Sequence, residues 1–256
     1  MKRASTIIVP DENRIVGPFA RFGQKILVIP NCPPEIRPPA RMNPRDPNVL
    51  TVLAMGYLGE RRGINQLLDA VSLVPEARVL MAGQFYEPWL EAKARSMPQV
   101  EFRGWVPWEE AIALGYEADV VFAFYDPARK VNVLANSGKW FDAMMTGTPI
   151  LSNREIANAS WIQEIGYLCP YGNKEELARV LRAILNDREQ AAQKGRRARA
   201  LYEQKYNWAL MEQRLLGAVR SIIGSPAPID GAKDLQQPVR VPSGETLSKA
   251  KKGGAR

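Results

Sequence analysis

Glycines and cations stand together in the segment from Gly56 to Gly63, which has the sequence G-Y-L-G-E-R-R-G. Gly56 and Gly59 would let the backbone approach a ligand closely. The segment follows a predicted strand and precedes a predicted helix, whose first amides are free donors at the positive end of the helix dipole. Arg62 adds guanidinium donors that suit phosphate oxygens. The pattern indicates either a site for an anionic ligand or an ordinary turn with arginines in solvent.

A second polar segment begins at Asn136 and continues through Ser137, Gly138, Lys139 and Asp142. Asn136 or Ser137 could cap a helix whose early amides meet a phosphate. Lys139 would bring a point charge to a diphosphate, and Asp142 could accept hydrogen bonds from ribose hydroxyls. The alternative is a capped helix that only packs its apolar face against the core. Both interpretations can hold, because packing uses the apolar face of the helix and ligand binding would use its polar face.

Two further segments follow predicted strands. Gly104 and Trp105 stand at the end of the third strand of the sheet, and ligands of open α/β sheets lie beyond the carboxyl ends of strands. A glycine and backbone polar groups there could contact a nucleobase, although packing is the commoner role of such a tryptophan. Arg129 and Lys130 lie in a loop after the fourth strand, where they could face a phosphate, and a solvated loop is the interpretation that we favour.

The chain contains no histidine, which excludes Ser–His and Cys–His nucleophiles and histidine proton shuttles. Its two cysteines, Cys32 and Cys169, are too few for a disulfide framework or a zinc site. Chemistry must therefore use carboxylates, cations or the substrate itself, and we expect no metal site.

The net charge of +8 indicates a solvated basic surface or an anionic partner, such as ligand phosphates, a membrane surface or nucleic acid. No helix-turn-helix, zinc or RNA-binding pattern supports nucleic acid. The sequence has no apolar run that could span a bilayer and no secretory signal, so we expect a cytoplasmic protein.

Short apolar runs alternate with helical periodicity and predict the elements that would hold these residues. The predicted strands of the main sheet are 49–55, 78–82, 100–102, 119–124 and 149–152. Such alternation predicts right-handed crossovers and a parallel, doubly wound α/β sheet. The candidate residues would then meet at the carboxyl ends of the strands.

The composition divides the chain into four parts. Residues 1–31 form a predicted strand–helix–strand unit, and residues 32–48 form a proline-rich linker. Residues 49–224 form the α/β domain with its C-terminal helices. Residues 225–256 are rich in Pro, Gly, Ser and Lys, which predicts a disordered basic tail.

Taken in order, these segments resemble the donor domain of GT-B glycosyltransferases, in particular the retaining group called family four. The resemblance runs from about Ser5 to Leu216, and its most specific part is the stretch 132–150. That stretch is similar to the segment that binds the nucleotide diphosphate and ribose. The resemblance implies a Rossmann-like domain that transfers a hexose, with retention, from a UDP-, GDP- or ADP-sugar without a metal or cofactor.

The resemblance implies two catalytic residues, Arg62 and Lys139, which would stabilise the charge on the leaving diphosphate. By the same resemblance Gly104 and Trp105 would flank the base, and Asp142 would hold the ribose. The complete donor-binding set is Gly56, Gly59, Arg62, Gly104, Trp105, Asn136, Ser137, Gly138, Lys139 and Asp142.

Two departures from the family keep other functions open. Leu134 stands where the family often carries an acid, and residues 5–31 match only the last part of an acceptor domain. The chain could therefore be a fragment, half of an enzyme completed by an acceptor-domain partner, or a non-catalytic nucleotide-sugar-binding or regulatory module. Peripheral attachment to the inner membrane face is a further expectation; a sugar-nucleotide epimerase and a nucleic-acid-binding protein are remote alternatives.

Overall fold

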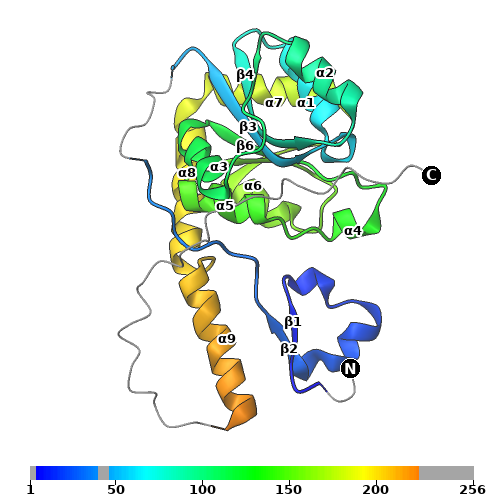
Figure 1. The fold of residues 1–256 in the computed structure, drawn as a ribbon, viewed down its shortest axis with the longest axis vertical. Coiled ribbons are helices and arrows are strands. Elements are labelled where there is room, and N and C mark those ends of the chain that lie inside the picture. The colour runs from blue at the N-terminus through cyan, green and yellow to red at the C-terminus, as the bar shows by residue number, and fades with distance from the viewer. Residues whose placement is uncertain (1–3, 40–45, 225–256) are drawn as a thin grey trace, which may run out of the picture.

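Residues 4–39 and 46–224 are described by the computed structural model (Figure 1). Six parallel strands form one sheet in the order β5-β4-β3-β6-β7-β8. The strands are β3 (Leu50–Leu58), β4 (Ala77–Phe85), β5 (Val100–Phe102), β6 (Val120–Ala123), β7 (Ile150–Asn153) and β8 (Gly166–Cys169). The order runs outward in both directions from β3 and β6, which is the doubly wound arrangement and confirms the predicted fold class.

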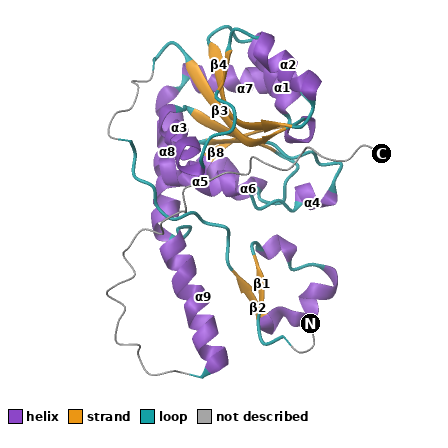
Figure 2. Ribbon diagram, viewed as in Figure 1, coloured by secondary structure: helices purple, strands orange, loops and turns teal. Residues whose placement is uncertain are grey.

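Helices cover both faces of the sheet (Figure 2). One face carries α1 (Ile64–Ser72), α2 (Pro88–Ser96) and α7 (Lys174–Asn186), and the other carries α3 (Trp108–Glu117), α5 (Gly138–Thr146), α6 (Ala159–Ile165) and α8 (Arg188–Gln204). Successive side chains of β3 alternate between two cores: Val52 belongs to the core that includes α1 and α7, and Leu53 belongs to the core that includes α3 and α5. The continuous apolar run of β3 follows from this burial on both faces.

Some elements of the domain were not predicted from the sequence. They include β8, α6 and the short helix α4 (Lys130–Val133). The strand β8 has the sequence G-Y-L-C, which lacks β-branched residues, so it carries little strand propensity of its own. It forms because its backbone pairs with β7 at the edge of the sheet.

A second, two-stranded parallel sheet lies near the N-terminus and pairs β1 (Ile7–Val9) with β2 (Ile26–Val28). The strands agree with the prediction, but the connection consists of two 3₁₀ segments, η1 (Glu12–Arg14) and η2 (Gly17–Lys25), instead of one helix.

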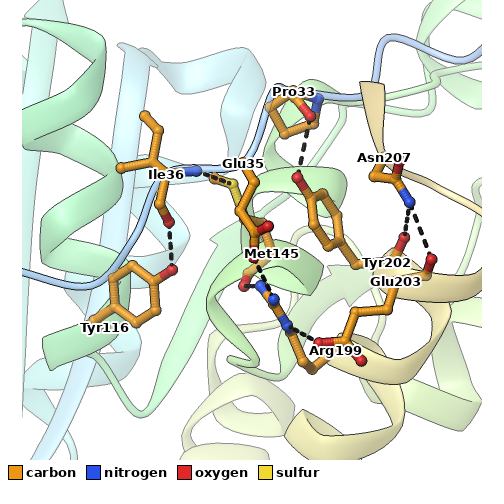
Figure 3. A network of polar contacts seen from close by, with 9 residues as sticks. All are labelled: Pro33, Glu35, Ile36, Tyr116, Met145, Arg199, Tyr202, Glu203 and Asn207. Atoms are coloured by element: carbon orange, nitrogen blue, oxygen red, sulfur yellow. Dashed lines mark hydrogen bonds and ion pairs between the residues drawn. The ribbon is translucent and has the colours of Figure 1, made fainter. Parts of the chain in front are cut away.

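The first part of the proline-rich linker is fixed on the α/β domain (Figure 3). The hydroxyl of Tyr202 in α8 donates to the carbonyl of Pro33 at 3.2 Å, and the hydroxyl of Tyr116 in α3 donates to that of Ile36 at 2.7 Å. These two hydrogen bonds fix the segment that follows β2 against α8 and α3.

The last helix, α9 (Trp208–Ile223), begins at the predicted cap residue Asn207. The side-chain oxygen of Asn207 accepts from the amide of Leu210 at 3.1 Å, and its nitrogen donates to the carbonyls of Tyr202 and Glu203 at 3.0 Å. Asn207 therefore joins the end of α8 to the start of α9. The predicted tail, 225–256, lies outside the described residues. Among the helices that the structure describes, none is long and apolar enough to cross a bilayer.

Replacing Asn207 with alanine should lower the free energy of unfolding by about 1–2 kcal/mol, because one helix cap and two bonds to α8 are lost. Urea denaturation monitored by circular dichroism measures the change. Gln213→Ala, on the exposed side of the same helix, should leave the midpoint nearly unchanged. Equal effects of the two substitutions would contradict a capping role.

Candidate functional site

A cavity of about 830 Å³ opens at the carboxyl ends of β3, β4 and β6. The strand order of the sheet reverses between β3 and β6, and ligands of doubly wound sheets bind at such a point. Its volume is within the usual range for a small-molecule site. The polar and charged side chains that line it are Arg14, Tyr57, Arg62, Gln84, Tyr86, Tyr125, Arg129, Asn132, Asn136, Ser137, Lys139 and Asp142.

Most of the predicted donor-binding set is brought together here: Gly56, Arg62, Trp105, Asn136, Ser137, Gly138, Lys139 and Asp142 all line the cavity. Gly59 and Gly104 do not. Gly59 precedes the 3₁₀ segment η3 (Glu60–Arg62), and a Cβ there would lie 2.8 Å from the ring of Tyr57. The carbonyl of Gly104 accepts from the amide of Gly83 at 2.7 Å. Neither glycine is therefore among the residues that line the cavity: Gly59 packs against Tyr57, and Gly104 pairs with β4 through its carbonyl.

Lys139 extends from the first turn of α5 toward the end of β3. A Cβ on Gly56 would lie 3.7 Å from the Lys139 Nζ, so the ammonium group occupies the space that this glycine leaves open. Gly56 also has a φ of 82°, which few other residues adopt. Lys139 forms no ion pair with any described residue, and its charge is available to a ligand.

Arg62 is held by aromatic rings and not by a carboxylate. Its guanidinium lies 4.5 Å from the ring centre of Tyr125 and 5.8 Å from that of Tyr57. Its Nη1 also donates to Asn132 Oδ1 at 3.4 Å. Cation–π contacts fix the position of an arginine without neutralising it. Arg62 therefore presents a full positive charge to the cavity.

The N-terminus of α5 faces the same cavity. Ser137 is the N-cap residue but makes no side-chain capping bond; its hydroxyl accepts a hydrogen bond from the hydroxyl of Tyr125 instead. The cap predicted for Ser137 or Asn136 is therefore absent, because Tyr125 engages one side chain and Asp11 the other. The early amides of the helix, at Gly138 and Lys139, keep the free donors that suit an anion.

Among the described residues, Asp142 is the one acidic side chain that lines the cavity, and it is partly buried. Burial raises the pKa of its carboxyl from 3.8 to about 7, and the charge of Lys139 and a hydrogen bond from Trp108 oppose this rise. The folded protein thus binds this proton more tightly than the unfolded chain does. Protonated Asp142 therefore contributes to the free energy of unfolding. This contribution is complete below about pH 4 and is lost as the pH rises to about 7.

Replacing Asp142 with asparagine should therefore stabilise the ligand-free protein in a pH-dependent way. We expect little difference at pH 4, an advantage that grows up to about pH 7, and a plateau on the order of 2–4 kcal/mol above it. Thermal and urea unfolding at several pH values measure this profile, with Glu212→Gln on the exposed face of α9 as a control. A constant difference across the range would contradict the raised pKa.

Four cations line the cavity, and two of them were not predicted as ligand contacts. Arg129 comes from the loop that we expected to be solvated, and Arg14 comes from η1 near the N-terminus. Among the described residues that line the cavity, these two arginines, Arg62 and Lys139 are the cations, and Asp142 is the one carboxyl group. Among the described residues, no group of three or more His, Cys, Asp or Glu side chains could hold a metal ion. The cavity therefore suits an anionic ligand.

Many solved structures resemble the protein in fold, and two of them serve as examples. Sucrose-phosphate synthase of Thermosynechococcus elongatus superposes with a TM-score of 0.66 at 20% identity, over 86% of this chain and 59% of that one. HepE of Anabaena, solved in complex with UDP and glucose, gives a TM-score of 0.64 at 19% identity, over 85% of this chain and 64% of its own.

One curated relative is similar in sequence, the sulfoquinovosyl transferase SQD2 of Arabidopsis thaliana. It is 27% identical over 174 residues, which are 66% of this chain and 32% of the relative. The chain thus spans about a third of that relative and less than two thirds of the two solved structures.

A family model described as glycosyl transferase-like matches residues 61–217. The match covers more than half of the chain and includes Arg62, Lys139 and Asp142. The chain therefore belongs to the glycosyl transferase-like family, and its six-stranded sheet is the Rossmann-like domain of the GT-B type.

Proposed function

We propose that the protein is a glycosyltransferase whose cavity binds a nucleotide-sugar by its diphosphate. The observation that carries this proposal is the meeting of Arg62 and Lys139, both without ion-pair partners among the described residues, with the free amides of α5. Guanidinium, ammonium and helix amides are the groups that bind phosphate oxygens in proteins. HepE was solved with UDP and with UDP-glucose, which supports uracil as the base to be tested first.

The chemistry that follows is electrostatic. As the bond between the sugar and the diphosphate breaks, negative charge develops on the leaving phosphate oxygen. Arg62 and Lys139 stabilise that charge without a metal ion, which a preorganised site does more effectively than water. Asp142 binds the ribose hydroxyls. Retention at the anomeric carbon rests on the resemblance to family four.

We further propose that the acceptor is bound by an additional α/β unit that packs against β1 and β2. Two-stranded sheets are marginally stable alone, and Ile8 in β1 is 52% exposed. The helix α9 also exposes Leu216, Val219 and Ile222. These exposed apolar side chains support the proposal that a further domain packs against this part of the chain.

A second candidate, a non-catalytic nucleotide-sugar-binding module, is favoured by Leu134. Leu134 is the C-cap of α4 and does not line the cavity. In the resemblance to the family, an acid that members often carry falls near this residue. Turnover separates the two candidates. Release of nucleotide from UDP-glucose, GDP-mannose or ADP-glucose, with water or added glycan acceptors, would support the transferase. Tight donor binding without release, under all these conditions, would support the module.

A further inference from the structure

Arg14 lines the same cavity as Arg62 and Lys139 but comes from a different part of the fold. It ends η1, in the segment between β1 and β2 that lies outside the six-stranded sheet (Figure 1). The N-terminal segment therefore completes the wall of the cavity and supplies one of its cations.

A buried polar network holds Arg14 in place. Asp11, which is 8% exposed, accepts from Asn136 Nδ2 at 2.7 Å and from Asn158 Nδ2 at 3.1 Å. Asn158 in turn accepts from Asn13 Nδ2 at 3.0 Å. The backbone amide of Arg14 donates to the carbonyl of Asp11 at 3.1 Å. The segment is thus bonded to the residues just before α5 and α6, and these bonds fix the backbone that carries Arg14.

The charge of Arg14 has no counterpart in the described protein. The carboxylate of Asp11 is already engaged by three donors, from Asn13, Asn136 and Asn158. Arg14 forms no ion pair with a described residue, and its Nε is buried without a hydrogen-bond partner there. Buried polar atoms of this kind are rare unless a ligand or water completes them.

The cavity holds more positive charge than a diphosphate requires. In a nucleotide-sugar each phosphate carries one negative charge, which Arg62 and Lys139 can match one for one. Arg14 and Arg129 remain, against the single carboxyl of Asp142. Arg129 is exposed and can be screened by solvent, whereas Arg14 is partly buried. A second anion in the bound complex would remove this imbalance.

We propose that Arg14 binds an anionic group separate from the diphosphate, carried by the transferred sugar or by the acceptor. A carboxylate, sulfonate or phosphate would suit its planar, bidentate donors. This inference rests on the proposed function, since the diphosphate must occupy Arg62 and Lys139. Asp11 acts as a positioning residue, because it fixes the segment that carries Arg14.

The test uses isothermal titration of the full chain with a free nucleoside diphosphate and its glucose and glucuronate conjugates, for whichever of UDP, GDP or ADP binds. For a sugar-borne anion we expect the glucuronate conjugate to bind about tenfold more tightly than the glucose conjugate. Arg14→Gln should abolish this preference by weakening the binding of the glucuronate conjugate, and the affinity for the glucose conjugate should change much less. Arg14→Lys should restore part of it, and Arg21→Gln, an exposed cation of the same segment, should behave as the wild type.

A second arm tests the acceptor as the source of the anion. With nucleotide bound, glycerol 3-phosphate should bind to the wild type and to Arg21→Gln, but about tenfold more weakly to Arg14→Gln, and neutral glycerol should show no such difference. Either Arg14-dependent preference supports the proposal and identifies the source. Nucleotide binding without any such preference in both arms overturns this proposal alone. Absence of binding by UDP, GDP and ADP would overturn the proposed function as well.

Discussion

Lys139→Ala is expected to raise the Kd for the nucleotide-sugar about 30-fold and to lower the rate of sugar transfer by about 10²–10³-fold. The first figure corresponds to the loss of one charge-assisted contact of about 2 kcal/mol in a partly buried site. The second is larger because the charge on the diphosphate grows as the sugar leaves, so the lysine stabilises the transition state more than the ground state.

The matched control for this substitution is Lys130→Ala. Lys130 is exposed in α4 and does not line the cavity, so its loss removes the same charge at a neighbouring site. Titration calorimetry and a nucleotide-release assay compare the two variants with the wild type. Arg62→Ala should resemble Lys139→Ala in both assays. Equal, small effects of Lys139→Ala and Lys130→Ala would mean that the diphosphate does not bind where we place it.

Gly83→Ala should destabilise the fold by about 3 kcal/mol or more and also distort the cavity. Gly83 in β4 stands opposite Gly56 in β3, and a Cβ added to it would lie 1.9 Å from the carbonyl oxygen of Gly56. Its φ of 153° is also unfavourable for other residues. The two central strands would have to separate at the edge of the cavity, and overpacking with backbone displacement has a cost of this size.

Urea unfolding measures this loss, and Gly217→Ala provides the control. Gly217 is exposed in α9 with no atom near its would-be Cβ, so alanine should be neutral or stabilise the helix by up to about 1 kcal/mol. A Gly83→Ala variant as stable as the wild type would show that β3 and β4 are not paired as described.

Much of the sheet was predictable, because its strands are buried on both faces and therefore appear as apolar runs in the sequence. The strand 100–102 was predicted with its observed bounds, and Asn207 was recognised as a cap from its position before an apolar helix. The main part of the candidate site followed for the same reason: Gly56, Ser137 and Lys139 come directly after predicted strands or at the start of a predicted helix. These features could be predicted because each depends on residues that are close together in the sequence.

Other features depend on contacts between distant parts of the chain. Arg14 reaches the cavity because Asp11 bonds to Asn158, and 147 residues separate that pair in the sequence. The raised pKa of Asp142 arises from burial beneath neighbouring elements. Gly59 shares its pattern with Gly56, yet only the three-dimensional turn places it behind Tyr57. No spacing rule in the sequence encodes these relations.

The most direct test of the central claim is a thermal-unfolding screen of the purified chain with UDP, GDP, ADP and their sugar conjugates. At about 100 times Kd, a ligand that binds only the folded state adds about 2.7 kcal/mol to its stability. We predict that one nucleotide series raises Tm and that Lys139→Ala and Arg62→Ala remove the shift. No shift with any nucleotide, or a shift that persists in both variants, would contradict the assignment of this cavity as a nucleotide-sugar site.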